Sequence, residues 1–241
     1  MPLGRSAPGC VPYSGRGPAR GTDDGERRIG VAGTHHVAGS SVTGTDLAGA
    51  QDTGTIFTDP SDPSSLIVDV VVRQLAVNRD PRGILVETLK VSWEDCYDAA
   101  EWPFAQTYYS VTEPWVARDE DQWHVHERQS DRFVVPTGNV VVGLYDPREG
   151  SPTFGRVNLL RLGQRNGDDG QILVLIPPRV YHGFLVLGPE SALLMNYPTR
   201  LYDRDDEGRV PIETSGARLA DGRTFSWELV REAERAGAAR R

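Results

Sequence analysis

Three histidines and one aspartate are the residues of this sequence best suited to chemistry. His124 and His126 stand one residue apart in QWHVHERQSD, which ends at Asp131, and His182 follows the run ILVLIPPRVY. Residues two apart in a strand point to the same face, so a strand over residues 123–127 would send both imidazoles into one enclosed space. Three histidines near the ends of strongly β segments therefore predict one site inside a barrel. Neutral imidazole is a base suited to pH 7, and imidazoles with a carboxylate also bind divalent metals.

The segments that must position these side chains read as short strands separated by turns. Two apolar runs, residues 133–135 and 140–144, flank Pro-Thr-Gly-Asn, a pattern that predicts a β-hairpin. Further strands are expected in SLIVDVVVRQLAV, ILVETLKV, QTYYSVTE, VNLLRLG, QILVLI, HGFLVLG and ALLMNYPT. The clear helical candidate is FSWELVREAERAGAARR at the end of the chain. This order indicates an all-β sandwich or barrel with a short C-terminal helix.

The first 65 residues differ in composition from the rest of the chain. They are rich in Gly, Ser, Thr, Pro and Asp and show almost no apolar periodicity. Such a segment cannot bury enough apolar surface to offset the entropy of ordering it. We predict a disordered N-terminal leader over residues 1–65, in which His35 and His36 are solvated, and one folded domain over residues 66–241. Whether the leader is part of the working protein stays open.

Charge and hydropathy exclude several classes of protein. The 241-residue chain has a formal net charge of −8, whereas a general nucleic-acid binder carries an excess of Lys and Arg. No apolar stretch approaches the roughly 20 residues of a spanning helix, and the N-terminus lacks the apolar core of a signal peptide. Of the two cysteines, Cys10 falls in the predicted leader, so no disulfide with Cys96 is expected. We expect a cytoplasmic protein without nucleic-acid or membrane partners.

Two motifs resemble the signatures of the cupin superfamily, whose members are jelly-roll β-barrels. From residue 124 the first motif reads H-x-H, four residues, D, six residues, G, and the second reads P-x-R-x-x-H and ends at His182. The superfamily usually has Glu in place of Asp131 and Gly in place of Arg179. The resemblance implies a cupin-type jelly-roll barrel.

Four motifs in order, from about residue 71 to 212, resemble the dTDP-4-dehydrorhamnose 3,5-epimerases, a branch of the cupins. The first motif, DPRGILVE, resembles D-x-R-G-x-x-x-E of the family. The second, RFVVPTGNVVVGLYDPREGSPTFG, resembles K-L-V-x-V-x-x-G-x-V-x-D-V-x-x-D-x-R-x-x-S-P-T-F-G. The third, VLIPPRVYHGFLVL, resembles I-P-x-G-x-A-H-G-F, and the fourth, NYPTRLYD, resembles Y-K-x-T-x-x-Y. The resemblance implies a homodimeric epimerase without metal or other cofactor. Its substrate would be a dTDP-4-keto-6-deoxyhexose that loses a proton at C3, C5 or both, in deoxysugar or polysaccharide biosynthesis.

The same resemblance implies roles for individual residues. Epimerisation beside a ketone needs a base, an acid on the other face of the ring and a group that stabilises the enolate oxygen. The implied base is His124, with His126 as an alternative, the implied acid is Tyr197, and Arg132 replaces a family lysine near the ketone. Substrate binding is implied for Arg82, Glu87, Gln106, Arg118, His126 and His182. The family orients its base with an aspartate, for which Glu213 and Asp221 are both candidates.

Two alternatives stay open at this point. The family reads R-G-L-H-x-Q around its base, whereas this chain reads ARDEDQWHVHERQ, and the doubled histidine is not needed by a metal-free epimerase. A metal-dependent cupin enzyme would use His124, His126, Asp131 and His182 as ligands. A non-catalytic sugar-binding barrel would lack the orienting carboxylate altogether.

Overall fold

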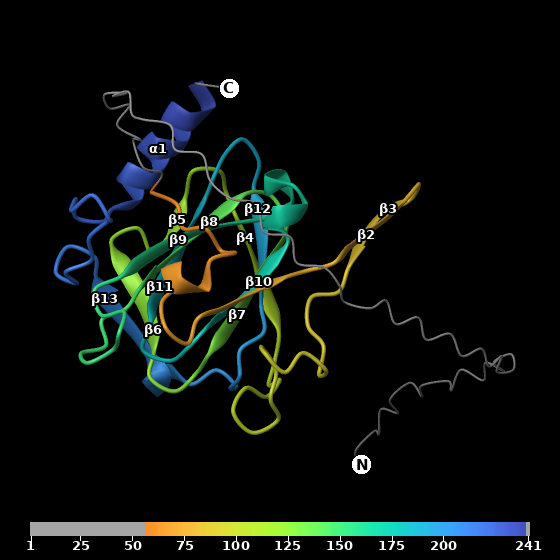
Figure 1. Ribbon diagram of the computed structural model, residues 1–241, viewed down its shortest axis with the longest axis horizontal. Coiled ribbons are helices and arrows are strands. Elements are labelled where there is room, and N and C mark those ends of the chain that lie inside the picture. Colours follow the sequence, from red (N-terminus) through yellow and green to blue (C-terminus); the bar gives the residue numbers. More distant parts are fainter. Residues whose placement is uncertain (1–55, 240–241) are drawn as a thin grey trace, which may run out of the picture. The chain divides into compact units, whose positions relative to one another are not determined.

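The computed structural model describes residues 56–239 as two facing β-sheets followed by one C-terminal helix (Figure 1). The predicted all-β jelly-roll class with a short C-terminal helix is confirmed. Most of the predicted leader, residues 1–55, lies outside the described residues. Among residues 56–239, no helix combines the length and apolar character needed to cross a membrane.

All strand pairs in the two sheets are antiparallel. The first sheet has the order β1 (Val71–Gln74), β10 (Ile172–Ile176), β7 (Asp131–Thr137), β12 (Ala192–Asn196) and β4 (Tyr108–Thr112). The second has the order β13 (Glu207–Pro211), β6 (Gln122–His126), β11 (Tyr181–Val186), β8 (Val140–Tyr145) and β9 (Val157–Leu162), and β5 (Ala117–Arg118) pairs with β11. A separate ribbon, β2 (Val77–Asp80) and β3 (Gly83–Val86), projects from the barrel (Figure 1).

Short helical segments connect the strands. The 3-10 turns are η1 (Pro63–Ser65), η2 (Gln164–Asn166), η3 (Asp168–Gly170) and η4 (Arg204–Asp206), and the helix is α1 (Trp227–Ala239). Residues 56–65, assigned by the prediction to the leader, touch the barrel. Thr58 donates its backbone N–H to the Leu159 carbonyl over 2.9 Å. Phe57 packs against the apolar cluster that includes the Leu159 side chain.

The core lies between the two sheets and follows the alternation of side chains along each strand. On β7, Phe133 and Val135 face the interior, whereas Val134 belongs to a second cluster on the outer face. Burial of these β-branched and aromatic side chains removes apolar surface from water at about 25 cal/mol per Å². The interior becomes polar near one end of β6, β7 and β11, where the histidines lie.

The hairpin predicted around Gly138 is wrong. β7 and β8 belong to different sheets, because β7 pairs with β10 and β12 while β8 pairs with β9 and β11. Gly138 has φ of 92°, and a β-carbon there would lie 2.5 Å from Ala192 Cβ. The Pro-Gly-Asn stretch thus carries the chain from one sheet to the other, since turn residues specify a reversal but not the partner strand.

The C-terminal helix covers the outer face of the second sheet. Trp227 is fully buried there, tilted against the ring of Trp123 and edge-to-face with that of Phe225. A β-carbon at Gly143 would lie 2.9 Å from Trp227 Cη2, and one at its cross-strand partner Gly183 would lie 3.1 Å from Cζ2. The glycine of the H-G-F motif therefore makes room for an indole ring rather than for a ligand.

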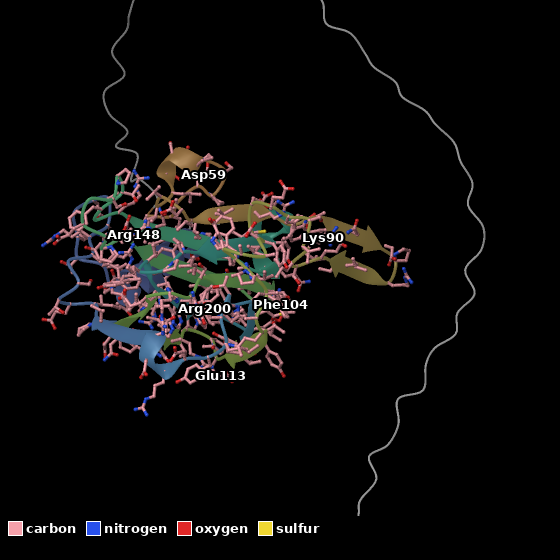
Figure 2. All side chains as sticks on the ribbon, turned by 90° about the horizontal axis from the view of Figure 1, so that it is seen from below. Asp59, Lys90, Phe104, Glu113, Arg148 and Arg200 are labelled. Carbon is pink, nitrogen blue, oxygen red and sulfur yellow. The ribbon has the colours of Figure 1, made fainter. Side chains whose placement is uncertain are left out.

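A buried aspartate organises the motif DPREGSPTFG after β8. Asp146 accepts hydrogen bonds from Arg148 Nε (2.8 Å), Ser151 Oγ (2.6 Å) and Thr153 Oγ1 (2.6 Å). Burial opposes ionisation of Asp146, but these hydrogen bonds outweigh it, and the pKa of Asp146 lies below its ordinary value. This motif, which resembles an epimerase motif, therefore stabilises the loop after β8 through hydrogen bonds to Asp146. Arg148 lies on the side of the barrel opposite the β2–β3 ribbon (Figure 2).

Asp146→Asn is expected to lower the free energy of unfolding by about 2–4 kcal/mol at pH 7, since it leaves buried donors poorly matched. The folded-state pKa of Asp146 is depressed, so its contribution is present above the unfolded-state value of about 4 and is lost as the pH falls below it. Urea unfolding should therefore separate the variant from the parent protein most at pH 7, and the difference should shrink progressively as the pH falls below about 4 toward the lowered folded-state pKa.

Asp221→Asn is the matched control for this prediction. Asp221 accepts from the backbone and Nε of Arg223 in the same local arrangement, but it is exposed. Its substitution should leave the urea midpoint unchanged. An equal effect of the two substitutions on the urea midpoint would show that burial of Asp146 does not add to the stability of the folded state.

Candidate functional site

The antiparallel register brings the four predicted residues into one cluster. His124 on β6 and His182 on β11 are direct cross-strand partners, and His126 lies two residues further along β6 on the same face. Asp131, the first residue of β7, faces them from the other sheet. One imidazole nitrogen or carboxylate oxygen from each residue lies within 4.8 Å of those of the other three.

The polar atoms of this cluster are in close contact. The Nε2 atoms of His124 and His126 are 2.9 Å apart. Asp131 Oδ2 lies 3.2 Å from His182 Nε2 and 3.6 Å from His126 Nε2. The three histidines and Asp131 thus enclose a small polar volume at the end of an otherwise apolar interior.

Charge states follow from this packing. Burial, and then the charges of His182 and Arg209, lower the pKa of His124 to about 2, and burial also lowers the pKa of His126. Burial alone would raise the pKa of Asp131, but its hydrogen bond with His182 and the neighbouring imidazoles outweigh this and lower it. At neutral pH the cluster therefore contains neutral His124 and His126 beside an ionised carboxylate.

Two hollows that share Tyr108, His124 and Arg209 in their walls open onto the cluster. One has a volume of about 160 Å³, and its walls include Tyr108, Arg118, His124, Asp131, His182 and Arg209. The other, of about 360 Å³, is lined by Gln106, Tyr108, His124, His126, Glu207 and Arg209, among others. Tyr108 on β4 and His124 on β6 line both hollows, and the two strands belong to different sheets. Predicted binding residues Gln106 and Arg118 therefore lie at the same site as the histidines.

Strand β13 supplies two residues that the sequence motifs did not indicate. Arg209 is the cross-strand partner of His124 and contacts its Nδ1, while Glu207 Oε1 lies 3.8 Å from that nitrogen and 2.6 Å from Arg209 NH2. The predicted candidates Glu213 and Asp221 lie elsewhere, exposed in loops after β13. Only the pairing of β13 with β6, about 80 residues apart in the chain, reveals Glu207 and Arg209.

Tyr197 and Arg132 are not brought to the histidine cluster. On β7, Asp131 and Phe133 face inward, so Arg132 faces outward, where it donates to the Tyr197 carbonyl over 2.9 Å. The Tyr197 hydroxyl is 2.7 Å from Thr88 Oγ1 in the outer apolar cluster. The acid role implied for Tyr197 and the ketone-polarising role implied for Arg132 do not fit these positions. The period of two along β7 was a signal that could have shown this for Arg132.

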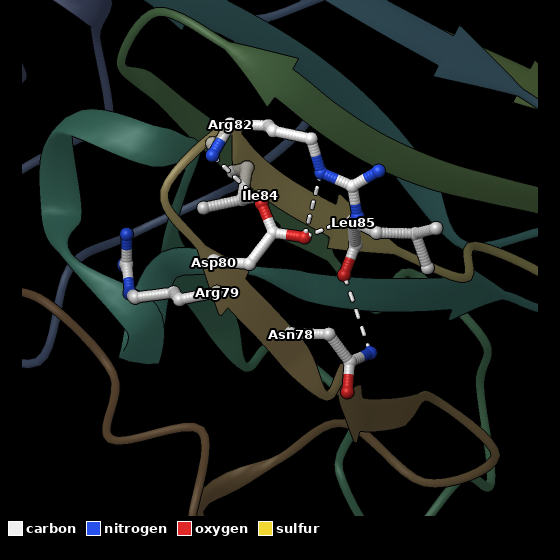
Figure 3. Close-up of a pocket in the computed structure, with 7 residues that line it drawn as sticks. Asn78, Arg79, Asp80, Arg82, Ile84 and Leu85 are labelled. Atoms are coloured by element: carbon white, nitrogen blue, oxygen red, sulfur yellow. Dashed lines mark hydrogen bonds and ion pairs between the residues drawn. The ribbon is translucent and has the colours of Figure 1, made fainter.

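Arg82 and Glu87 lie outside the barrel. Figure 3 shows Arg82 folded back onto Asp80 at the tip of the β2–β3 ribbon, with Nε 3.0 Å from Oδ2, beside a shallow pocket formed by the ribbon itself. Glu87, just after β3, pairs with Lys90, which Figure 2 labels at the base of the ribbon. Within the described residues neither side chain lines the hollows around His124.

Comparisons with known proteins agree on the family to which this chain is similar. The family model for dTDP-4-dehydrorhamnose 3,5-epimerase matches residues 64–220. The probable low-salt glycan biosynthesis epimerase Agl13 of Haloferax volcanii is 44% identical over 150 residues, covering 61% of this chain and 89% of that protein. The spore coat polysaccharide biosynthesis protein SpsL of Bacillus subtilis is 34% identical over 148 residues, covering 61% and 90%.

Solved structures agree with this comparison. A dTDP sugar isomerase from Desulfovibrio desulfuricans G20 superposes with a TM-score of 0.57 at 26% identity, covering 67% of this chain and 92% of that one. An epimerase from Legionella pneumophila Philadelphia 1, in complex with dTDP-4-keto-L-rhamnose, has a TM-score of 0.53 at 24% identity, covering 66% and 84%, and shows the shared fold. The predicted resemblance is confirmed, and the chain belongs to the dTDP-4-dehydrorhamnose 3,5-epimerase family of isomerases.

Proposed function

We propose that the protein epimerises a dTDP-4-keto-6-deoxyhexose by removing a proton from a carbon next to the ketone, at C3, C5 or both. The observation that carries this proposal is His124, an imidazole kept neutral on the wall of both hollows. The names of the relatives support the substrate class, since Agl13 is called a glycan biosynthesis epimerase and the Legionella enzyme holds a dTDP-4-keto sugar. The product would enter deoxysugar or polysaccharide biosynthesis.

His124 is the proposed base. Arginine can only donate, so its contact makes Nδ1 of His124 the nitrogen with the lone pair. Arg209 itself lines both hollows, so a bound sugar meets this side of the imidazole and would take the place of Arg209 at Nδ1 when the proton is removed. His126, the alternative base, is more deeply buried and its Nε2 accepts from His124. These contacts favour His124.

Tyr108 is the proposed acid, in place of Tyr197. Its hydroxyl accepts a hydrogen bond from Asn196 Nδ2 over 2.8 Å, which leaves the phenolic proton free for another acceptor. Burial, and then the charge of Asp131, raise the pKa of Tyr108, so the phenol is protonated at neutral pH. A sugar ring between β4 and β6 would have the base on one side and this proton donor on the other.

Binding of the nucleotide is assigned to residues around the barrel mouth and on the ribbon. Arg118 and Gln106 line the hollows and are suited to the diphosphate and the nucleoside. Arg82 and Glu87 project away from the histidines of their own chain, so they would serve the site of a partner subunit. The proposed enzyme is therefore a homodimer.

Arg82→Ala should weaken nucleotide-sugar binding without changing the fold.

Deuterium wash-in tests the proposed function. Incubation of dTDP-4-keto-6-deoxyglucose with the protein in heavy water should label C3, C5 or both, as followed by NMR. Labelling of one carbon or of two would tell single from double epimerisation. Absence of labelling with a fully folded protein would rule out proton abstraction from this substrate and favour a binding barrel or a different reaction.

A further inference from the structure

Removal of a proton beside a ketone places negative charge on the ketone oxygen, which then needs a hydrogen-bond donor in the site. Among the arginine and lysine side chains of residues 56–239, Arg209 is the one that lines both hollows. Arg132 lies on the outer face, and Arg118 lines only the smaller hollow, where its Nε donates to Thr112 Oγ1 over 3.1 Å. The cation in contact with the proposed base is therefore Arg209 of β13.

Two carboxylates hold the guanidinium of Arg209 in place. Its NH2 lies 2.6 Å from Glu207 Oε1 on the same strand, and its Nε lies 3.4 Å from Asp119 Oδ1 in the turn before β6. The side chain is nevertheless 36% exposed, so a sugar in the hollows can reach it. A donor that is fixed before the substrate arrives needs little rearrangement as charge develops on the substrate.

The NH1 nitrogen of Arg209 has two contacts for its two protons. One proton is donated to the Gly208 carbonyl over 3.2 Å, and the other to Nδ1 of His124. The lone pair of Nδ1 must become available when His124 accepts a proton from the sugar, so this second N–H then needs another acceptor. An enolate oxygen suits it, because arginine stays protonated and donates strongly to anionic oxygen.

The substrate brings such an oxygen to the same place. In a 4-keto sugar the acidic hydrogen and the ketone oxygen are carried by adjacent carbon atoms, so a base that takes the hydrogen has the oxygen beside it. His124 and Arg209 are direct cross-strand partners, and side chains in such a pair lie next to each other on one face of the sheet. A base and a donor in contact thus correspond to two substrate groups on neighbouring atoms.

We propose that Arg209 is the catalytic cation that stabilises the enolate oxygen, in the role that the family motif implied for Arg132. This inference rests on the proposed function, since it names a group that the same reaction needs. His124 Nδ1 takes the proton, the electron pair of the C–H bond forms a carbon–carbon double bond, and the carbonyl π pair moves to the oxygen, to which Arg209 donates. Reprotonation of the carbon reverses this electron flow, and Arg209 stays protonated throughout.

Substitution of Arg209 tests the inference by deuterium wash-in with dTDP-4-keto-6-deoxyglucose. Arg209→Ala should lower kcat for exchange by about 10²–10³-fold, the usual loss on removal of one oxyanion donor, with KM within about threefold of the parent protein. Guanidinium chloride at millimolar concentration should restore part of the exchange, whereas sodium chloride at the same ionic strength should not. Arg209→Lys, which keeps the charge, should lose less than Arg209→Ala.

Arg223→Ala is the matched control. Arg223 is also an exposed arginine on a carboxylate, that of Asp221, but it lines neither hollow. Its substitution should leave exchange unchanged, and guanidinium chloride should not affect this variant.

Polarisation of the ketone provides a readout that does not require turnover. His124→Ala should bind the keto sugar without exchanging its protons, so the infrared C=O stretch of the bound sugar, located by an isotope label at C4, can be recorded in this variant. A donor at the oxygen weakens the C=O bond. The stretch should therefore lie at lower wavenumber in His124→Ala than in the double variant that also carries Arg209→Gln.

The outcomes separate this inference from the proposed function. Unchanged exchange in Arg209→Ala, or a raised KM with unchanged kcat, would overturn the inference, as would a C=O stretch that does not depend on Arg209. Equal losses in Arg209→Ala and Arg209→Lys without rescue by guanidinium would also overturn it and assign Arg209 a structural role. A C=O stretch that depends on Arg209, in a protein whose parent shows no exchange, would contradict the proposed function alone.

Discussion

His124→Ala is expected to lower deuterium incorporation into dTDP-4-keto-6-deoxyglucose by about 10²–10⁴-fold, the usual contribution of a positioned general base. The imidazole is neutral at pH 7 because burial and neighbouring positive charge disfavour its protonated form. Alanine removes an imidazole that lines both hollows while leaving Arg118 and Gln106 in place. NMR of the substrate in heavy water measures the exchange at C3 and C5.

Nucleotide binding is the control for this variant. The dissociation constant for dTDP, measured by calorimetry, should be unchanged in His124→Ala, since the predicted nucleotide contacts come from other residues. Unimpaired exchange in His124→Ala, with exchange lost in His126→Ala, would transfer the base to His126. Loss of both exchange and dTDP binding would point instead to a structural role for His124.

Tyr108→Phe is expected to separate exchange from inversion. His124 would still remove the proton and return deuterium to the same face, so labelling should continue at a rate within about threefold of the parent protein. Delivery of a proton to the opposite face would fall by about 10²–10⁴-fold, because phenylalanine has no hydroxyl. The ratio of labelled substrate to inverted product, read from proton couplings in the sugar ring, is the measurement.

Tyr197→Phe is the matched control for Tyr108→Phe. The Tyr197 hydroxyl contacts Thr88 in the outer cluster, so its removal should leave both labelling and inversion unchanged. Inversion that survives in Tyr108→Phe but fails in Tyr197→Phe would restore the acid role implied by the family motif and refute the role of Tyr108.

Particular residues show how far the sequence could be read. The H-x-H spacing predicts a shared face for His124 and His126, and the structure has them on one face of β6. The same period of two along DRFVV predicts that Asp131 and Phe133 lie on one face of the strand and Arg132 on the other. The resemblance to the family motif nevertheless assigned Arg132 to the site. Along β12, Ala192, Leu194 and Asn196 face the interior, so the same period of two places Tyr197 on the outer face.

The sequence by itself determined most of the strands, the C-terminal helix and the family, because apolar alternation, turn residues and motif order are properties of short segments. It did not indicate β2, β5 or β13. Tertiary structure decided which strands pair. It separated β7 and β8 into two sheets, brought Arg209 beside His124 and set Tyr108 opposite it. These contacts join segments up to about 80 residues apart, so they depend on long-range register and on the packing of one sheet against the other, which no local pattern encodes.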